Sequence, residues 1–277
     1  MSKNKNRLTE DTKSNDAVLI STDEISINIQ PYLVPLSIIV GAIIISLSIF
    51  LSVKGQLFSQ TPSVAGATNP TGTAPTVAEE QNPAAKTNVN GAPYLGDKNT
   101  AKIAIVEFSD VECPFCKRHH EQVYPDVIKN LVDSGKAIYA YRTYIAVPSH
   151  NPAATLEANA AYCLYEQSGN NNAKFFEYLT GLYTNTQANG AGLVGTKAFD
   201  LVNDMGMNSG DVKSCAEAGK FAQFIAGDQA LAEQAGVQGT PGFVVGKLSA
   251  DGNVDGKLIA GAYPYSEFER VANEMLQ

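Results

Sequence analysis

The stretch Cys113-Pro114-Phe115-Cys116 places two cysteines one helical turn apart, directly after an apolar run at 101–108. That run is rich in β-branched residues and predicts a buried strand, while the residues after it have helical periodicity. The unpaired amides and the positive dipole end of this helix favour the thiolate form of Cys113. Cys116 lies one turn later and is placed to attack any mixed disulfide that Cys113 forms. The stretch therefore predicts redox chemistry.

Three other interpretations of the cysteine pair are weaker. A purely structural bridge is uncommon where a strand passes into a helix. A zinc site would need four ligands, and although His119 and His120 lie nearby, the sequence offers no second tight pair. An inactive binding domain would be expected to have lost a cysteine. We therefore expect neither a metal nor a cofactor.

The charge balance narrows the choice of partners. The 277 residues include 20 basic and 28 acidic side chains, without a basic stripe. Nucleic acid is therefore not an expected partner.

The chain before residue 94 divides into three predicted segments. Residues 1–31 form a polar tail. The 22 residues 32–53 carry no charge, and as a helix they would be about 33 Å long, enough to cross a membrane. Residues 54–93 are rich in proline, glycine and small polar residues, which predicts a disordered linker. Basic residues concentrate before the span, so we expect the tail in the cytoplasm and the rest outside.

A cleaved signal peptide is the alternative to this membrane anchor. Ala65-Gly66-Ala67 resembles a cleavage site, but it lies well beyond an apolar run that is already too long for a signal peptide. We therefore predict an uncleaved signal anchor and a single-pass protein of the cell membrane.

Residues 94–277 are expected to form one α/β domain. A strand at 137–144 follows a helix at 114–132, so that the cysteines lie at the carboxyl end of the first strand, where ligands gather in open sheets. A helical insertion is predicted at about 150–236, its last helix at 209–235 being long or broken. For the end of the domain, the pattern predicts strands at 243–245 and 258–260, with a hairpin marked by Asp251-Gly252 and Asp255-Gly256. An amphipathic helix is predicted at 264–276.

Three spaced motifs give this domain a family resemblance. They are Glu107-Phe108-Ser109-Asp110 before the cysteine pair, Ser149-His150-Asn151-Pro152-Ala153 at the start of the insertion, and Gly239-Thr240-Pro241-Gly242 before the third strand. With these motifs in this order, residues 94–277 resemble the DsbA-like branch of the thioredoxin superfamily, the bacterial extracytoplasmic thiol–disulfide oxidoreductases. The resemblance implies a thioredoxin fold in the order βαβ, helical insertion, ββα. It also implies that Cys113 attacks and Cys116 resolves.

The resemblance implies roles for further residues. The Thr240–Pro241 bond would be a cis-proline facing the cysteines, and together with Pro114 and Phe115 it would contact the substrate. Glu107 would be the buried acid beneath the pair, able to relay a proton to or from Cys116. An ordinary trans proline at 241 and an outward-facing carboxylate at 107 stay open as alternatives.

The other two cysteines, Cys163 and Cys215, both fall in predicted helices of the insertion. In an oxidising compartment two such cysteines more often pair than stay free, so we expect a structural disulfide. Two buried unpaired thiols are the alternative, because sequence does not show whether the residues lie within bonding distance.

The expected function is donation of a disulfide to reduced or unfolded exported proteins. A membrane partner of the quinone-linked thiol oxidase type would reoxidise the pair. Two alternatives stay open: a membrane-tethered reductase or isomerase, and a tethered binding module without catalysis. The reduction potential of the pair distinguishes a reductase or isomerase from an oxidase. Reactivity of one cysteine at mildly acid pH would exclude a binding module without catalysis. We expect structural or surface roles for His119, His120 and His150.

Overall fold

The computed structural model describes residues 82–277. The predicted tail at 1–31, the predicted span at 32–53 and the linker as far as residue 81 lie outside the described residues. From 82 onward, no helix combines the length and the apolar character that a membrane crossing requires.

A mixed sheet forms the centre of the domain. Strand β3, which is buried at every position, pairs in parallel with β4 and antiparallel with β5, and every other neighbouring pair is antiparallel. A helix-containing crossover joins β3 to β4, and a hairpin joins β5 to β6. This is the predicted thioredoxin fold. The sheet order is β1-β6-β5-β3-β4-β2, with β1 at Ala84–Asn88, β2 at Tyr94–Leu95, β3 at Ile103–Ser109, β4 at Ala137–Thr143, β5 at Gly242–Leu248 and β6 at Asn253–Ala260.

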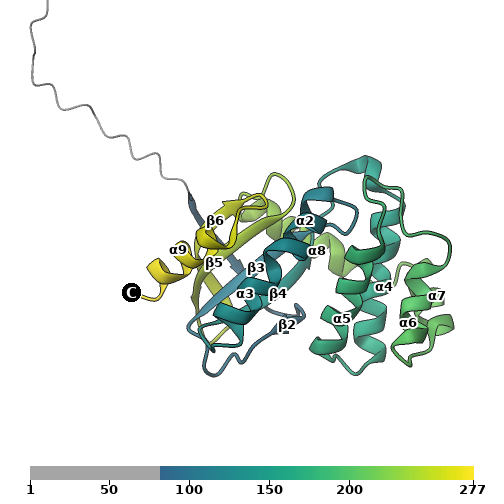
Figure 1. The fold of residues 1–277 in the computed structure, drawn as a ribbon, viewed down its shortest axis with the longest axis horizontal. Coiled ribbons are helices and arrows are strands. Elements are labelled where there is room, and N and C mark those ends of the chain that lie inside the picture. The colour runs from purple at the N-terminus through teal and green to yellow at the C-terminus, as the bar shows by residue number, and fades with distance from the viewer. Residues whose placement is uncertain (1–81) are drawn as a thin grey trace, which may run out of the picture. The chain divides into compact units, whose positions relative to one another are not determined.

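Helices cover both faces of this sheet (Figure 1). Because side chains of a strand alternate between faces, Ile103 and Ile105 of β3 pack into one core with α2, α3, α9 and the insertion, while Val106 packs into a second core with α8. The helices are α2 (Pro114–Gln122), α3 (Tyr124–Val127), α4 (Ala153–Gln167), α5 (Asn172–Asn185), α6 (Lys197–Asp204), α7 (Ser209–Glu217), α8 (Ala222–Gln234) and α9 (Tyr265–Met275). Helices α4 to α7 form a compact group beside the sheet (Figure 1).

The predicted linker at 54–93 extends too far. Strand β1 lies inside it and pairs with β6 from Ala84 opposite Lys257 to Asn88 opposite Asn253. The buried Arg142 also donates hydrogen bonds to the carbonyl oxygens of Asn88 and Asn90. The domain therefore begins before residue 84 rather than at 94. Its first strand has little apolar periodicity of its own and is held by backbone pairing.

Two predicted helices are broken. The helix expected at 114–132 ends at Gln122 and continues as α3 and a π-helical turn, Ile128–Val132. Pro125 explains the break, because proline has no N–H and its ring obstructs the carbonyl four residues earlier. The helix expected at 209–235 divides into α7 and α8, and Gly219 after α7 has a φ of +63°, which suits a helix end.

The hairpin between β5 and β6 turns at Asp251-Gly252 only. Asp255-Gly256 lies within β6, where Gly256 faces Gly246 across the strands. A Cβ atom at 256 would overlap the carbonyl oxygen of Val245. This glycine therefore serves close strand approach rather than a turn.

Candidate active site

The cysteine pair lies where the sequence predicts, at the junction of β3 and α2. Cys113 is the N-cap residue of α2 and has extended backbone angles, and Pro114 follows at the first helical position. Proline fits there because the missing N–H would be unpaired anyway. Cys113 and Cys116 are not joined by a disulfide in this structure, which therefore describes the reduced pair.

Several donors converge on the sulfur of Cys113. Its pKa is lowered to about 6, first by a hydrogen bond from the Cys116 thiol, then by Thr240 and by the backbone N–H groups of Cys116 and Phe115. Burial opposes this shift. The amides belong to the first turn of α2, as the helix N-terminus predicts. Cys113 is therefore a thiolate at neutral pH, the form that attacks a disulfide.

Cys116 has the opposite character. It is completely buried, and burial raises its pKa well above the ordinary value, as does the neighbouring Cys113 sulfur. Cys113 still has 4% of its surface exposed. Both cysteines are buried, but only Cys113 is ionised at neutral pH and keeps a small exposed surface.

The loop before β5 faces this pair. The Thr240–Pro241 peptide bond is cis, which excludes the ordinary trans turn, and the Sγ atom of Cys113 lies 3.3 Å from the Thr240 carbonyl oxygen. A cleft of about 450 Å³ extends from this loop to Ala260 and Gly261. Pro241 is buried, whereas Phe115 is 54% exposed beside the cysteines.

Glu107 is buried beneath the pair, so the outward-facing alternative is wrong. It is 1% exposed, and burial raises its pKa to about 7, with a further increase from Cys113. The Tyr139 hydroxyl donates to its Oε2 atom at 2.8 Å. A carboxyl group with this pKa can take or give a proton at neutral pH.

Two further acids beside the cysteines were not predicted as site residues. Asp110 Oδ2 lies 2.6 Å from Nδ1 of the buried His150, which joins the end of β3 to the start of the insertion. The buried Glu112 accepts a hydrogen bond from the backbone of Gly192 at 2.8 Å. Asp110 and His150 each belong to one of the motifs that carry the family resemblance. Their place in these motifs is the only feature of the sequence that pointed to either residue.

Glu157 of α4 completes this acidic group. Its pKa is raised to about 9 by burial and by the charges of Glu112 and Asp110, so it is protonated at neutral pH. The group ties the turn before Cys113 to the helical insertion. It also places negative charge close to the redox pair.

The two histidines of α2 are buried and neutral. Burial lowers the pKa of His119 to about 3 and that of His120 to about 4. Their Nε2 atoms lie 3.3 Å from the Tyr139 hydroxyl and 3.0 Å from the Thr180 hydroxyl, respectively. Among residues 82–277, no group of three or more His, Cys, Asp or Glu side chains is arranged to hold a metal ion.

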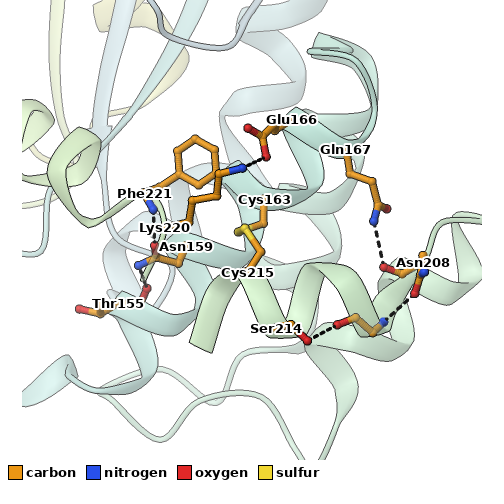
Figure 2. Close-up of a disulfide and its surroundings, with 11 residues drawn as sticks. Thr155, Asn159, Cys163, Glu166, Gln167, Asn208, Ser214, Cys215, Lys220 and Phe221 are labelled. Carbon is orange, nitrogen blue, oxygen red and sulfur yellow. Dashed lines mark hydrogen bonds and ion pairs between the residues drawn. A yellow bond between two sulfur atoms is a disulfide. The ribbon is translucent and has the colours of Figure 1, made fainter. Parts of the chain in front are cut away.

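The structure joins Cys163 of α4 to Cys215 of α7 in a disulfide, with Cα atoms 6.1 Å apart (Figure 2). Two nearby hydrogen bonds also join α4 to the residues on either side of α7. Asn159 accepts a hydrogen bond from the Phe221 backbone at 3.0 Å, and Gln167 donates one to the Asn208 carbonyl at 3.2 Å (Figure 2). The bond therefore lies within the insertion and joins α4 to α7.

A thioredoxin fold with a dithiol at the start of its first crossover helix, facing a cis-proline, defines a thioredoxin-like thiol–disulfide exchange protein. The family described as Thioredoxin matches residues 73–261, and the chain belongs to this family. The curated relatives include a disulfide bond formation protein and protein-disulfide oxidoreductases, and the fold is similar to that of solved DsbA structures, in agreement with the resemblance that the motifs indicate.

Three comparisons describe this relationship. Disulfide bond formation protein D of Bacillus subtilis is 25% identical over 156 residues, 56% of this chain and 67% of that protein. A Rickettsia conorii protein with the provisional name of protein-disulfide oxidoreductase is 28% identical over 65% of this chain and 63% of its own length. The chain thus spans about two thirds of these curated relatives. The crystal structure of oxidised BdbD from Bacillus subtilis has a similar fold, with a TM-score of 0.59, 20% identity, and coverage of 70% of this chain and 97% of that one.

Proposed function

We propose that this chain is an extracytoplasmic thiol–disulfide oxidoreductase that donates the Cys113–Cys116 disulfide to reduced or unfolded exported proteins. The difference between the two cysteines carries the proposal. Cys113 has a pKa of about 6 and is 4% exposed, whereas Cys116 is completely buried and its pKa is raised. A stabilised thiolate is a good leaving group and makes the oxidised pair a better oxidant.

The reaction consists of two exchanges. A client thiolate attacks Cys113 Sγ of the oxidised pair, which forms a mixed disulfide and releases Cys116 as a thiolate. Cys116 then takes a proton, for which the protonated form of Glu107 is the proposed donor. A second client thiolate attacks the client sulfur of the mixed disulfide and releases Cys113 as its thiolate. The client loses two electrons and the pair gains them.

The loop at Thr240 and Pro241 is the proposed place of client binding. Because proline contributes no N–H, the strand edge near it is free to pair with an extended segment of a client. The adjacent cleft can take a client side chain, and the exposed ring of Phe115 with the neighbouring Pro114 offers apolar contact next to Cys113.

The proposed direction is net oxidation, with a mild oxidant. The helix N-terminus favours the reduced, thiolate form, while Asp110 and Glu112 place negative charge nearby and oppose it. The purified chain should therefore oxidise a reduced, unfolded client faster than it rearranges a scrambled one. A reduction potential as low as about −270 mV, that of thioredoxin, would contradict this direction and favour the reductase alternative.

The proposed location is the outer face of the cell membrane, with residues 32–53 as an uncleaved anchor and a quinone-linked thiol oxidase as the membrane partner. The uncharged length of this segment and the basic residues before it support the proposal. A reporter that works only outside the cytoplasm should be active when fused after Gln277, and inactive when fused after Lys13. A mature protein that begins near Thr68 would contradict the anchor.

A further inference from the structure

A chain of hydrogen bonds leads from α2 to the buried acid. His119 Nε2 lies 3.3 Å from the Tyr139 hydroxyl oxygen, and that hydroxyl donates to Glu107 Oε2 at 2.8 Å. All three side chains are at most 1% exposed, and the second oxygen of Glu107, Oε1, has no hydrogen-bond partner among the described residues. Oε2 of Glu107 thus accepts a hydrogen bond, whereas Oε1 accepts none from the described residues.

The two hydrogen bonds that link His119, Tyr139 and Glu107 can be donated in one direction only. Tyr139 has a single proton and gives it to Glu107, so its oxygen can only accept from His119. His119 must then carry its proton on Nε2. This assignment fits its Nδ1 atom, which has no partner in the described part of the chain and on which a buried N–H would be left unsatisfied.

Among residues 82–277, no positively charged side chain is among the groups that shift the pKa of Glu107. The ionisable groups that shift its pKa are Tyr139 and Cys113, and its own charge raises the pKa of Tyr124, Tyr139, Tyr141 and Tyr183. His119 faces His120 and the rings of Phe243 and Phe268, whose centroids lie 4.5 and 5.3 Å from its own.

Ser109 lies on the side of Glu107 that faces the cysteines. It is two residues further along the same face of β3, and its hydroxyl lowers the pKa of both Glu107 and Cys116. Its hydroxyl lies 2.8 Å from the Tyr183 hydroxyl, and Oε1 has no hydrogen-bond partner of good geometry among the described residues, so Ser109 is a neighbour of the Glu107 carboxyl group rather than a fixed partner of Oε1. Ser109 is thus a neighbour that Glu107 and Cys116 share.

We propose that His119 and Tyr139 are positioning residues that hold Oε2 of Glu107 through successive donated hydrogen bonds and leave Oε1 to exchange the proton of Cys116. This inference rests on the proposed function. When the pair is reoxidised, the Cys116 thiol loses its proton to Oε1, and its sulfur attacks Cys113 Sγ of a mixed disulfide. The Cys113–Cys116 bond forms, and the other sulfur of the mixed disulfide leaves as a thiolate. During client oxidation the same proton returns from Oε1 to Cys116. The donor chain stabilises the carboxylate against the effect of burial.

The test measures the pH dependence of the resolving step in the full-length chain. The reduced protein is mixed with excess oxidised glutathione, which forms a mixed disulfide at Cys113, and attack by Cys116 then releases glutathione. Acid quenching and mass spectrometry follow this second phase. In the native chain its rate should have an inflection near pH 7, the pKa of Glu107, and Glu107→Gln should remove it.

Substitutions at two residues separate a positioning role from a packing role. Tyr139→Phe removes the donor to Glu107, so the inflection should move upward by about one pH unit, the size expected for one hydrogen bond to a charged group. His119→Leu should move it in the same direction by less, and His119→Gln, which retains a donor near the place of Nε2, should restore it. Because the two residues act in series, the Tyr139→Phe/His119→Leu double variant should shift no further than Tyr139→Phe.

Tyr141→Phe is the matched control, because it removes another buried hydroxyl of β4 that donates to the Ser109 carbonyl rather than to Glu107. Its profile should match the native one. An unchanged inflection in Tyr139→Phe, or equal shifts in Tyr139→Phe and Tyr141→Phe, would overturn the inference while the proposed function stands. If Tyr139→Phe does not fold, the comparison of His119→Leu with His119→Gln decides. A native chain that does not react with oxidised glutathione at all would overturn both.

Discussion

The Sγ atom of Cys113 lies 3.3 Å from the carbonyl oxygen of Thr240, although 127 positions separate the two residues in the chain. The contact joins the start of α2 to the loop before β5, since both lie at the same edge of the sheet. It brings the reactive sulfur next to the cis-proline at 241. A client that pairs with this loop would therefore present its disulfide or thiol directly to Cys113.

The first prediction concerns the ionisation of Cys113. Alkylation of the reduced chain by a small reagent should reach half its maximal rate near pH 6, because that is the pKa at which the thiolate forms. Cys116 should react only after unfolding, since it is buried and its pKa is raised. Cys113→Ala should abolish the reaction at pH 6. A half-maximal rate near about 8.5, the ordinary value for cysteine, would contradict the asymmetry of the pair.

The second prediction concerns the disulfide between Cys163 and Cys215. It closes a sequence separation of 52, so its loss in Cys163→Ala/Cys215→Ala should lower the free energy of unfolding by roughly 4 kcal/mol in the chain-entropy picture. Denaturant unfolding of the oxidised proteins gives this difference. Peptide mapping without reductant should find the two cysteines joined. A freely alkylated Cys163 in the native, oxidised protein would show that the bond is absent.

The third prediction concerns the buried ion pair of Arg142 and Asp228, which are 2% and 1% exposed. Asp228 also accepts hydrogen bonds from the Tyr162 hydroxyl at 2.8 Å and the Thr143 amide at 3.1 Å. Asp228→Asn leaves the guanidinium buried without a counter-charge, so unfolding should require about 3 kcal/mol less free energy.

The exposed pair of Lys220 and Glu166 is the matched control for this third prediction (Figure 2). Its side chains are about half exposed, so Glu166→Gln should change the free energy of unfolding by no more than about 1 kcal/mol. Equal effects of Asp228→Asn and Glu166→Gln would mean that Arg142 and Asp228 do not stabilise the junction of β4 and α8.

Local patterns were sufficient for the parts of the site that depend on sequence neighbours. The apolar run before Cys113 and the proline at the start of α2 each have a direct structural consequence, and the structure has the expected strand and helix. The cis bond at Thr240–Pro241 was implied by the family resemblance, and the structure has it as well. The phase of Glu107 was open, because every residue of β3 is buried and a central strand has no polar face.

What the sequence did not reveal depends on contacts between distant segments. Strand β1 is held by pairing with β6 and by Arg142, and its own five residues lack a strand pattern. The pairs Asp110–His150 and Glu112–Glu157 join residues from opposite sides of the insertion boundary, where spacing along the chain carries no signal. The link from His119 through Tyr139 to Glu107 likewise needs α2 folded onto the sheet.

Trapping of mixed disulfides tests the central claim most directly. In Cys116→Ala, Cys113 can still attack a client disulfide but no thiol remains to resolve the product, so covalent complexes should accumulate and disappear on reduction. Cys113→Ala should trap none, because Cys116 is buried and protonated. Non-reducing electrophoresis of the two variants, expressed as full-length chains, gives the result. The account predicts complexes through Cys113 in Cys116→Ala alone, and complexes in Cys113→Ala but not in Cys116→Ala would contradict it.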